Sequence, residues 1–197
     1  YAGQAVIVFV IVFPRIFSVA KTNYPRLQIA RSIFLMTATC LFFLSISKIG
    51  LAQATAIMDI NPVLITLGAF LFLGEKIGPR RIVGVFASLI GAMIIIRPGS
   101  EVFTVYAVFP LFAAICYSAY NLTTRFVGKN ENPWTSLFYT ALCGATVFTA
   151  IVPFYWQPLS MFSGVLILFL AIFGTAAHLS LIRALAIGEA SMLAPFI

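Results

Sequence analysis

The chain has 197 residues, of which 62% are hydrophobic and only 9% are charged, and its mean hydropathy is +1.08. Soluble domains carry about 25% charged residues, so this composition excludes an ordinary water-soluble protein and indicates an integral membrane protein. The formal net charge of +7 does not indicate nucleic-acid binding, because the basic residues lie near the ends of apolar runs and form no patch.

Apolar runs recur along the chain with the length, about 20 residues, that a helix needs to cross a bilayer. They do not alternate polar and apolar residues as the strands of a membrane barrel would. The fold is therefore predicted to be all-α, a polytopic bundle of membrane helices. Breaks at charged residues, Pro and Gly place these helices at about 4–20, 29–47, 52–73, 81–97, 103–125, 134–156 and 164–183, and an eighth begins near residue 190.

The helix predicted over 52–73 has a recognisable end. Gly74 is expected to act as a glycine stop, and Pro79 follows a few residues later. Glu75 and Lys76 come directly after the glycine, and we interpret them as a helix cap and an orientation signal.

Basic residues are divided unevenly between the two alternating sets of loops. The loops near 20–31, 74–81, 125–133 and 183–189, with their helix ends, hold Arg15, Lys21, Arg26, Arg31, Lys76, Arg80, Arg81, Arg125, Lys129 and Arg183. The other set holds only Lys48 and Arg97. Because Lys and Arg are enriched in cytoplasmic loops, we expect the first set of loops to be cytoplasmic.

The helix predicted over 81–97 carries small residues at Gly84, Ala87, Ser88 and Gly91. Small residues four positions apart let two helices approach closely in lipid. We expect this helix to pack closely within its own bundle. The alternative interpretation is a homodimer interface.

The three cysteines, Cys40, Cys116 and Cys143, lie in separate apolar runs without the spacing of a metal site or a redox motif. We interpret them as buried residues that pack like small apolar side chains. The sequence therefore predicts neither a metal centre nor a cofactor.

A faint internal repeat appears when the chain is shifted by 136 residues against itself. This shift places residues 47–59 on residues 183–195, so that Thr55 faces Ser191. Five predicted helices separate the two segments, so they would enter the membrane from opposite faces. That arrangement is typical of an inverted repeat, in which substrate sites lie near the bilayer midplane between the two halves.

Two series of motifs follow this repeat along the chain. The first is Ala52-Gln-Ala-Thr-Ala, Asn61-Pro62, Leu73-Gly-Glu, Gly84, Gly91 and Arg97-Pro98-Gly99, and the second is Ile182-Arg-Ala-Leu-Ala and Ala190-Ser-Met-Leu-Ala-Pro-Phe. Together they resemble the two repeats of the EamA family of the drug/metabolite transporter superfamily. The resemblance covers nearly the whole chain.

The resemblance implies a ten-helix bundle of two inverted five-helix repeats, here residues 1–99 and 100–197. This chain would then run from about the second helix to the start of the ninth and be part of a longer protein. Members of the family move small metabolites, such as amino acids, vitamins or nucleoside-like compounds, across the bacterial inner membrane. We accordingly expect a secondary carrier that works by alternating access, with a small-molecule substrate and the lipid bilayer as its partners and no enzymatic activity.

A membrane-embedded enzyme and a structural membrane subunit are the alternatives. An intramembrane protease needs paired aspartates or a serine–histidine arrangement. This sequence has a single acidic residue within an apolar run, Asp59, and neither a Gly-x-Ser-x-Gly nor a His-Glu-x-x-His motif. A purely structural membrane subunit would not explain why the sequence has both Asp59 and an inverted repeat.

Polar residues form a stripe on the helix predicted over 52–73. Thr55, Asp59, Pro62 and Thr66 recur at the spacing of one helix face, and Asn61 lies beside them. Such a stripe should face a cavity, where Asp59 could hold a proton or bind a cationic group. Pro62 can bend the helix and free a carbonyl. The alternative for Asp59 is a protonated or hydrogen-bonded packing residue.

Polar side chains on two later helices are weaker candidates for the substrate pathway. His178 is the single histidine and could relay protons, although a structural bond to a neighbouring helix explains it equally simply. Tyr117, Asn121 and Thr124 share one helix face and could either line the pathway or bond between helices.

Arg31 and Arg183 complete the candidate residues. Arg31 lies at the start of the second predicted helix and Arg183 at the end of the seventh. Snorkelling of the side chain toward the cytoplasmic interface would explain both residues. The alternative is that they bind an anionic group at the mouth of a cavity.

Overall fold

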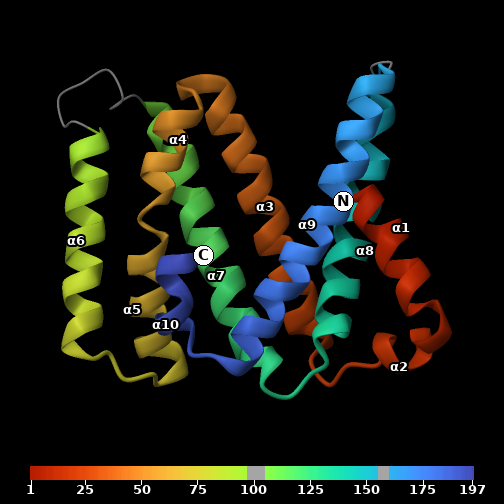
Figure 1. Ribbon diagram of the computed structural model, residues 1–197, viewed down its shortest axis with the longest axis horizontal. Helices are drawn as coiled ribbons and strands as arrows, with labels where there is room; N and C mark the ends of the chain where they lie inside the picture. Colours follow the sequence, from red (N-terminus) through yellow and green to blue (C-terminus); the bar gives the residue numbers. More distant parts are fainter. Residues whose placement is uncertain (97–104, 155–159) are drawn as a thin grey trace. The chain divides into compact units, whose positions relative to one another are not determined.

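The computed structural model of the chain describes residues 1–96, 105–154 and 160–197. Every regular element in these ranges is a helix (Figure 1), which confirms the all-α prediction. The elements are α1 (Ala2–Val12), η1 (Phe13–Arg15), α2 (Ile16–Ala20), α3 (Pro25–Ile49), α4 (Leu51–Met58), α5 (Asn61–Leu73), α6 (Pro79–Ile96), η2 (Val105–Ala107), α7 (Val108–Gly128), α8 (Pro133–Ile151), η3 (Val152–Phe154), α9 (Met161–Ile187), α10 (Ala190–Leu193) and η4 (Ala194–Phe196).

Within the described residues, six helical stretches are long and apolar enough to cross a membrane. They are Ala2–Ala20, Pro25–Ile49, Leu51–Leu73, Val105–Gly128, Pro133–Phe154 and Met161–Ile187. The helix predicted over 81–97 is α6, whose described apolar part, Ile82–Gly91, is shorter. The ends predicted at 97, 103 and 156 lie outside the described residues. The chain is thus a multi-pass membrane protein.

Two helices that were predicted as continuous are interrupted. The first changes to a 3₁₀ turn at Phe13–Arg15, with Pro14 at the start of that turn. The second divides into α4 and α5 at Asp59 and Ile60, and its ribbon narrows to a turn there (Figure 1). Proline removes one backbone donor and crowds the preceding turn, which accounts for both interruptions.

The chain forms two compact units. Unit 1 comprises Tyr1–Ile33 and Val127–Ile187, and unit 2 comprises Phe34–Phe126 and Gly188–Ile197. The chain passes from one unit to the other within α3, within α7 and after α9. Each unit therefore contains segments from both halves of the sequence.

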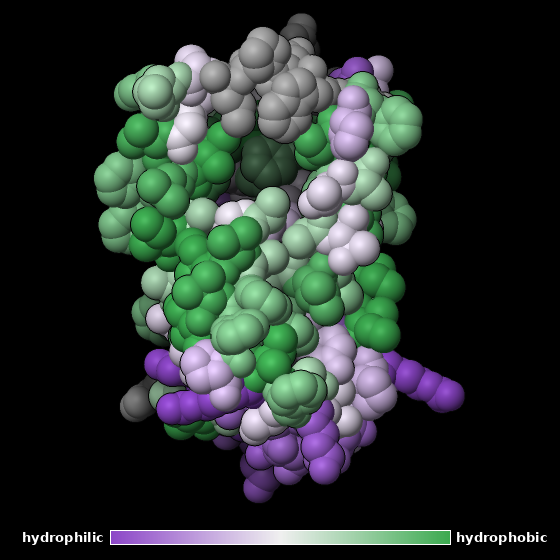
Figure 2. All heavy atoms as spheres, turned by 90° about the vertical axis from the view of Figure 1, so that its right-hand side faces the viewer, coloured by the Kyte–Doolittle hydropathy of each residue, from purple (hydrophilic) through white to green (hydrophobic). Residues whose placement is uncertain are grey.

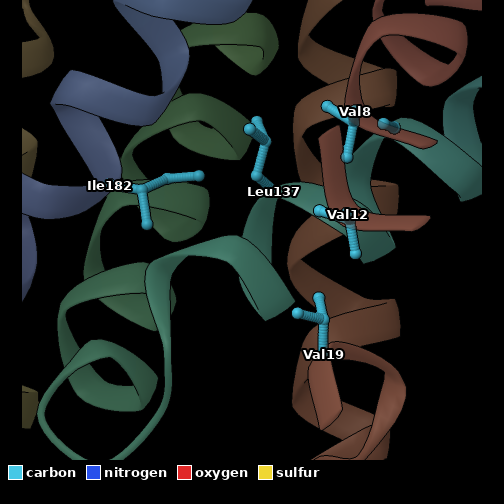
Figure 3. Packing of buried hydrophobic residues seen from close by; sticks show 6 residues of the cluster. Val8, Val12, Val19, Leu137 and Ile182 are labelled. Atoms are coloured by element: carbon cyan, nitrogen blue, oxygen red, sulfur yellow. The ribbon is translucent and has the colours of Figure 1, made fainter. Parts of the chain in front are cut away.

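Unit 1 is built around a small apolar core. It packs α1 and α2 against α8 and α9 (Figure 3), and its buried members are Val8, Val12, Val19, Leu137, Ala141 and Ile182. All six are at most 5% exposed. Three branched valines on α1 and α2 fill this seam because the first helix presents one face to its neighbours.

The outer surface has the distribution expected in a bilayer. Figure 2 shows one face of the molecule, covered mainly by hydrophobic side chains, with hydrophilic ones gathered at one end.

In unit 1 the backbone N–H of Asn23 donates to Glu131 Oε1 at 2.6 Å. This bond joins the α2–α3 and α7–α8 connections, so these two polar loops lie at the same end of unit 1.

Gly74 ends α5 as predicted. It has φ of +66° in the left-handed region, and its N–H and that of Glu75 both reach the Ala69 carbonyl oxygen. Glycine tolerates this conformation because it has no Cβ. The turn fixes the direction in which the chain leaves α5, and hence the position of Glu75.

We expect Gly74→Ala to destabilise the intact protein by about 1 kcal/mol, because a Cβ is strained at this φ. Thermal unfolding of the purified full-length protein in detergent would measure the effect. Gly78→Ala is the matched control, since Gly78 lies in the same loop without a positive φ and a Cβ there would meet nothing within 4 Å. Equal unfolding temperatures for the two variants would contradict this account.

Candidate functional site

The interruption between α4 and α5 leaves backbone carbonyls without their usual helical donors. Pro62 has no N–H, so the carbonyl of Met58 loses its partner four residues on. The N–H of Val63 donates to the Ile60 carbonyl at 3.1 Å instead of one turn back to Asp59. The Ser88 hydroxyl on α6 donates to the Asp59 carbonyl at 3.5 Å. A neighbouring helix thus supplies one of the missing donors.

A cavity of about 480 Å³ lies beside this interruption, wholly within unit 2. Its volume falls in the range of about 300–1,000 Å³ that is usual for small-molecule sites. Helices α5, α6, α10 and η4 form its walls. The lining residues are Pro62, Thr66, Gly84, Val85, Ser88, Ser191, Met192 and Pro195. Three hydroxyl groups on an otherwise apolar wall can orient a polar substrate without binding a fixed charge.

The polar stripe predicted on this helix is divided by the interruption. Pro62 and the buried Thr66 line the cavity. Thr55 lies on α4, and its hydroxyl donates to the carbonyls of Leu51 and Ala52. The prediction that these residues share one face assumed a continuous helix over 52–73. The turn at Asp59 instead separates two helical segments.

The Asp59 side chain is exposed and, among the described residues, its carboxylate has neither a hydrogen-bond nor an ion-pair partner. Its backbone is nevertheless linked to the cavity, since Ser88 both lines the cavity and donates to the Asp59 carbonyl. A carboxylate at membrane depth is costly unless it faces water or a partner. Its open position suits a group that exchanges protons or contacts a solute.

Asn61 joins α5 to α7. The buried Asn61 accepts a hydrogen bond from the Ser118 hydroxyl at 3.2 Å. Ser118 was not singled out from the sequence, although it lies one turn before Asn121 on the same helix. The bond holds the first turn of α5, and with it Pro62, against α7.

The polar face predicted on α7 is mostly internal. Asn121 is fully buried and donates through Nδ2 to the Tyr117 carbonyl at 2.8 Å. Its Oδ1 has no partner among the described residues. Tyr117 stacks on Tyr120, with 6.1 Å between the ring centroids. These two candidate residues are not among the residues that line the cavity.

His178 and Arg183 lie in unit 1 and contact neighbouring helices there. His178 Nδ1 lies 3.0 Å from Gln4 Nε2, which joins α9 to α1. The guanidinium of Arg183 lies over the Trp134 ring, 5.8 Å from its centroid, at the distance of a cation–π contact. The contact of His178 corresponds to the structural alternative for this residue.

Arg31 does not snorkel to an interface, contrary to one expectation from the sequence. It is fully buried and donates to Gln28 Oε1 at 3.0 Å and to the Ser136 carbonyl at 2.6 Å. Helix α3 begins at Pro25, four residues earlier than predicted, so Arg31 lies in its second turn. Gln28 in turn donates to the Ser136 hydroxyl and to Glu131. Polar acceptors from α3 and α8 make the interior position of the charge tolerable.

Glu75 caps a helix, but a different one from that expected. Its Oε1 accepts the N–H of Ala190 at 3.0 Å, and its Oε2 accepts the N–H of Ser191 at 3.0 Å and the Ser191 hydroxyl at 2.8 Å. Arg125 Nε lies 3.4 Å from Oε1. The carboxylate is therefore bound to the start of α10 and to α7, in a part of the sequence far from α5.

The ionisation of Glu75 follows from these contacts. Burial alone would raise the pKa of the Glu75 carboxyl, but the hydrogen bonds from Ser191 and Ala190 and the charge of Arg125 outweigh it and lower the pKa below its ordinary value. The group is thus ionised at neutral pH.

Among the described residues, no group of three or more His, Cys, Asp and Glu could hold a metal ion.

Comparison with known proteins identifies the family. Residues 2–97 match the EamA-like transporter family. This matched segment belongs to the family, which lies in the drug/metabolite transporter superfamily. A riboflavin transporter of Brucella anthropi is 30% identical over 113 residues, 57% of this chain and 40% of the relative. No solved structure gives a significant match.

Other EamA-like relatives carry different substrate names. An S-adenosylmethionine uptake transporter of Rickettsia bellii is 25% identical over 176 residues, 89% of this chain and 60% of the relative. A pseudopaline exporter of Pseudomonas aeruginosa is 25% identical over 142 residues, 71% of this chain and 48% of the relative. The chain thus spans between 40% and 60% of the length of these relatives.

We expect Arg31→Gln to destabilise the intact EamA-like protein by about 3 kcal/mol, because it removes a charged donor from buried acceptors. Thermal unfolding in detergent would measure the loss. The exposed Arg26, on the same helix, provides the control Arg26→Gln, which should change the unfolding temperature little. A similar small change in both variants would show that the buried network contributes little.

The stability contributed by Glu75 should depend on pH in one direction. Because folding lowers its pKa, the contribution is complete above the unfolded value of about 4.3 and is lost as the pH falls through the folded value. The difference in the free energy of unfolding between the natural protein and Glu75→Gln should therefore stay constant, at about 1–3 kcal/mol, from pH 5 to pH 8. It should shrink below about pH 4. A difference that grows on acidification would refute this sign.

Proposed function

We propose that the intact protein is a secondary transporter that moves a small organic metabolite across the bacterial inner membrane by alternating access. The cavity beside the interrupted helix is the observation that carries this proposal, because discontinuous helices in membrane carriers supply backbone groups to substrates. The names of the EamA-like relatives support the same activity. An exporter among those relatives leaves both transport directions open to test.

The character of the cavity wall supports a neutral polar substrate. Thr66, Ser88 and Ser191 provide hydroxyl groups, and Val85 and Met192 provide apolar surface. Among the residues that the structure describes, none of those that line the cavity is charged. An uncharged vitamin with hydroxyl groups and a flat ring system, as in the riboflavin transported by one relative, fits this wall better than a strongly charged amino acid. We therefore place a riboflavin-like compound first and a nucleoside-like compound second.

Several observations support the inverted repeat of residues 1–99 and 100–197. The hydroxyls of Thr39 and Thr175, which are 136 positions apart, each donate to the carbonyl four residues earlier in their own helix. Helix α4 ends at Met58 and α10 ends at Leu193, which differs by one position from the same shift. Matching interruptions in the two halves are expected of such carriers.

The orientation in the membrane is part of the proposal. The loops near 20–31, 74–81, 125–133 and 183–189 would be cytoplasmic, because they carry most of the Lys and Arg residues. The hydrogen bond between Asn23 and Glu131 supports placing the first and third of these loops on one face. We assign Asp59, Asn61, Pro62, Thr66 and Thr55 to the substrate pathway or its helix.

The remaining candidate residues receive secondary roles. We give them structural roles, because Tyr117 and Asn121 make contacts within α7 and the other three residues join helices of unit 1. Those three are His178, Arg31 and Arg183, which contact Gln4, Ser136 and Trp134. A homodimer through the small residues of α6 is a further proposal. A membrane enzyme or a structural subunit would account for the fold equally well, but not for the transporter relatives.

The intact protein in membrane vesicles gives the direct test. A panel of riboflavin, S-adenosylmethionine, amino acids and nucleosides should be assayed for uptake and export, with and without a proton gradient. Gradient-dependent movement of one compound supports a secondary carrier. Absence of movement for every compound in both directions, by a protein shown to be inserted and folded, would refute the proposed transport.

We expect Asp59→Asn in the intact protein to abolish or uncouple transport while membrane insertion remains normal, because the amide cannot exchange a proton or carry a charge. The rate with and without the gradient is the measurement. Glu189→Gln is the matched control, since it also removes one carboxylate from an exposed position. Undiminished, gradient-coupled transport by Asp59→Asn would exclude Asp59 from the mechanism.

A further inference from the structure

We propose that Glu75 acts as a latch that holds α10 against the end of α5, and that its release opens one end of the cavity during the transport cycle. This inference rests on the proposed function for its place in a cycle. The latch itself is a set of contacts within unit 2, and it can be tested without any substrate.

The contacts of Glu75 use the full accepting capacity of a carboxylate. Oε1 accepts from Ala190 and from Arg125, and Oε2 accepts twice from Ser191. Four donors on two oxygens match the four lone-pair directions of the group. The two backbone N–H groups belong to the first turn of α10, whose donors would otherwise be unpaired. Breaking the latch therefore leaves several polar groups without partners at once.

The latch connects two walls of the cavity. Glu75 follows α5 directly, and its position is fixed by the left-handed turn at Gly74. Helix α10 lies beside α5 (Figure 1) and contributes Ser191 and Met192 to the lining. Movement of α10 away from α5 at this end would widen the cavity, and such a movement must first break the bonds to Glu75.

Ser191 couples the latch to the contents of the cavity. Its hydroxyl hydrogen is donated to Glu75, and the same residue lines the cavity. While the latch is closed, Ser191 Oγ can only accept a hydrogen bond from a solute. A solute that accepts a hydrogen bond from Ser191 would compete directly with Glu75 and weaken the latch. Glu75 is therefore a positioning residue that acts on the substrate through Ser191.

The sequence offers a matched control for the charge of Glu75. Glu189 is the residue before α10, is exposed, and makes no side-chain bond to the amides of that helix. Glu189→Gln removes one negative charge at the same end of α10 as Glu75→Gln. A general electrostatic effect would change both variants alike, whereas the latch predicts an effect of Glu75 alone.

Accessibility of a cysteine in the cavity wall tests the latch. Gly84 lines the cavity, and a Cβ there would meet nothing within 4 Å, so Gly84→Cys should be tolerated. In a full-length protein otherwise free of cysteine, we expect Glu75→Gln to raise the labelling rate of this thiol by a membrane-impermeant maleimide about tenfold or more, and Ser191→Ala by about threefold. Vesicles of both orientations show at which membrane face the rate rises.

Two comparisons separate a local opening from loss of structure. Cys143 on α8 in unit 1, retained alone in a second background, should keep its labelling rate when Glu75→Gln is introduced. If Glu75→Gln fails to enter the membrane, Ser191→Ala and Glu75→Asp provide the test with milder changes. A parallel rise at Cys143, or equal labelling of Gly84→Cys in the Glu75→Gln and Glu189→Gln variants, would overturn the latch.

The labelling result and the transport result distinguish the two proposals. Faster labelling of Gly84→Cys in Glu75→Gln, by a protein that transports none of the panel compounds, would keep the latch and refute the transporter. Normal transport with unchanged labelling would keep the transporter and refute the latch.

Discussion

The absence of water in the hydrocarbon core is the constraint on which this structure depends. Every backbone N–H and carbonyl at that depth needs a partner within the protein, so an interruption in a membrane helix is costly unless other elements repair it. The turn at Asp59 and Ile60 is such an interruption. Ser88 on α6 provides a donor to the Asp59 carbonyl, and Ser118 on α7 binds Asn61 at the first turn of α5. The polar side chains of the neighbouring helices are explained by this repair.

The same constraint accounts for the role of Glu75. The first turn of α10 has unpaired N–H groups, which must be satisfied near the membrane surface or by the protein. A buried carboxylate at the end of α5 satisfies two of them, and Arg125 balances its charge. A local requirement for hydrogen bonding thus joins Glu75 to Ala190 and Ser191, which lie 115 and 116 positions later in the sequence. The cavity is enclosed by elements that these bonds hold together.

The two buried polar centres have different functional meanings. In unit 1, Arg31 and Gln28 bind acceptors on α8, and we expect these buried bonds to act on stability. In unit 2, the hydroxyls of Ser88 and Ser191 donate to other parts of the protein, and the same two residues line the cavity. In the proposed carrier, hydroxyl groups in both roles would let a bound solute alter the bonds between helices, as alternating access requires.

The amino-acid sequence by itself determined the helices, because apolar runs of membrane length have no other stable structure in lipid. It also determined the stop at Gly74 and the weak point at Pro62, since both follow from the covalent structure of these residues. The partners of polar side chains were decided only by the tertiary structure. Glu75 was expected to cap its own helix and binds α10 instead, and Arg31 was expected at an interface and is buried. Such contacts join residues more than 100 positions apart, and periodicity along one helix contains no information about them.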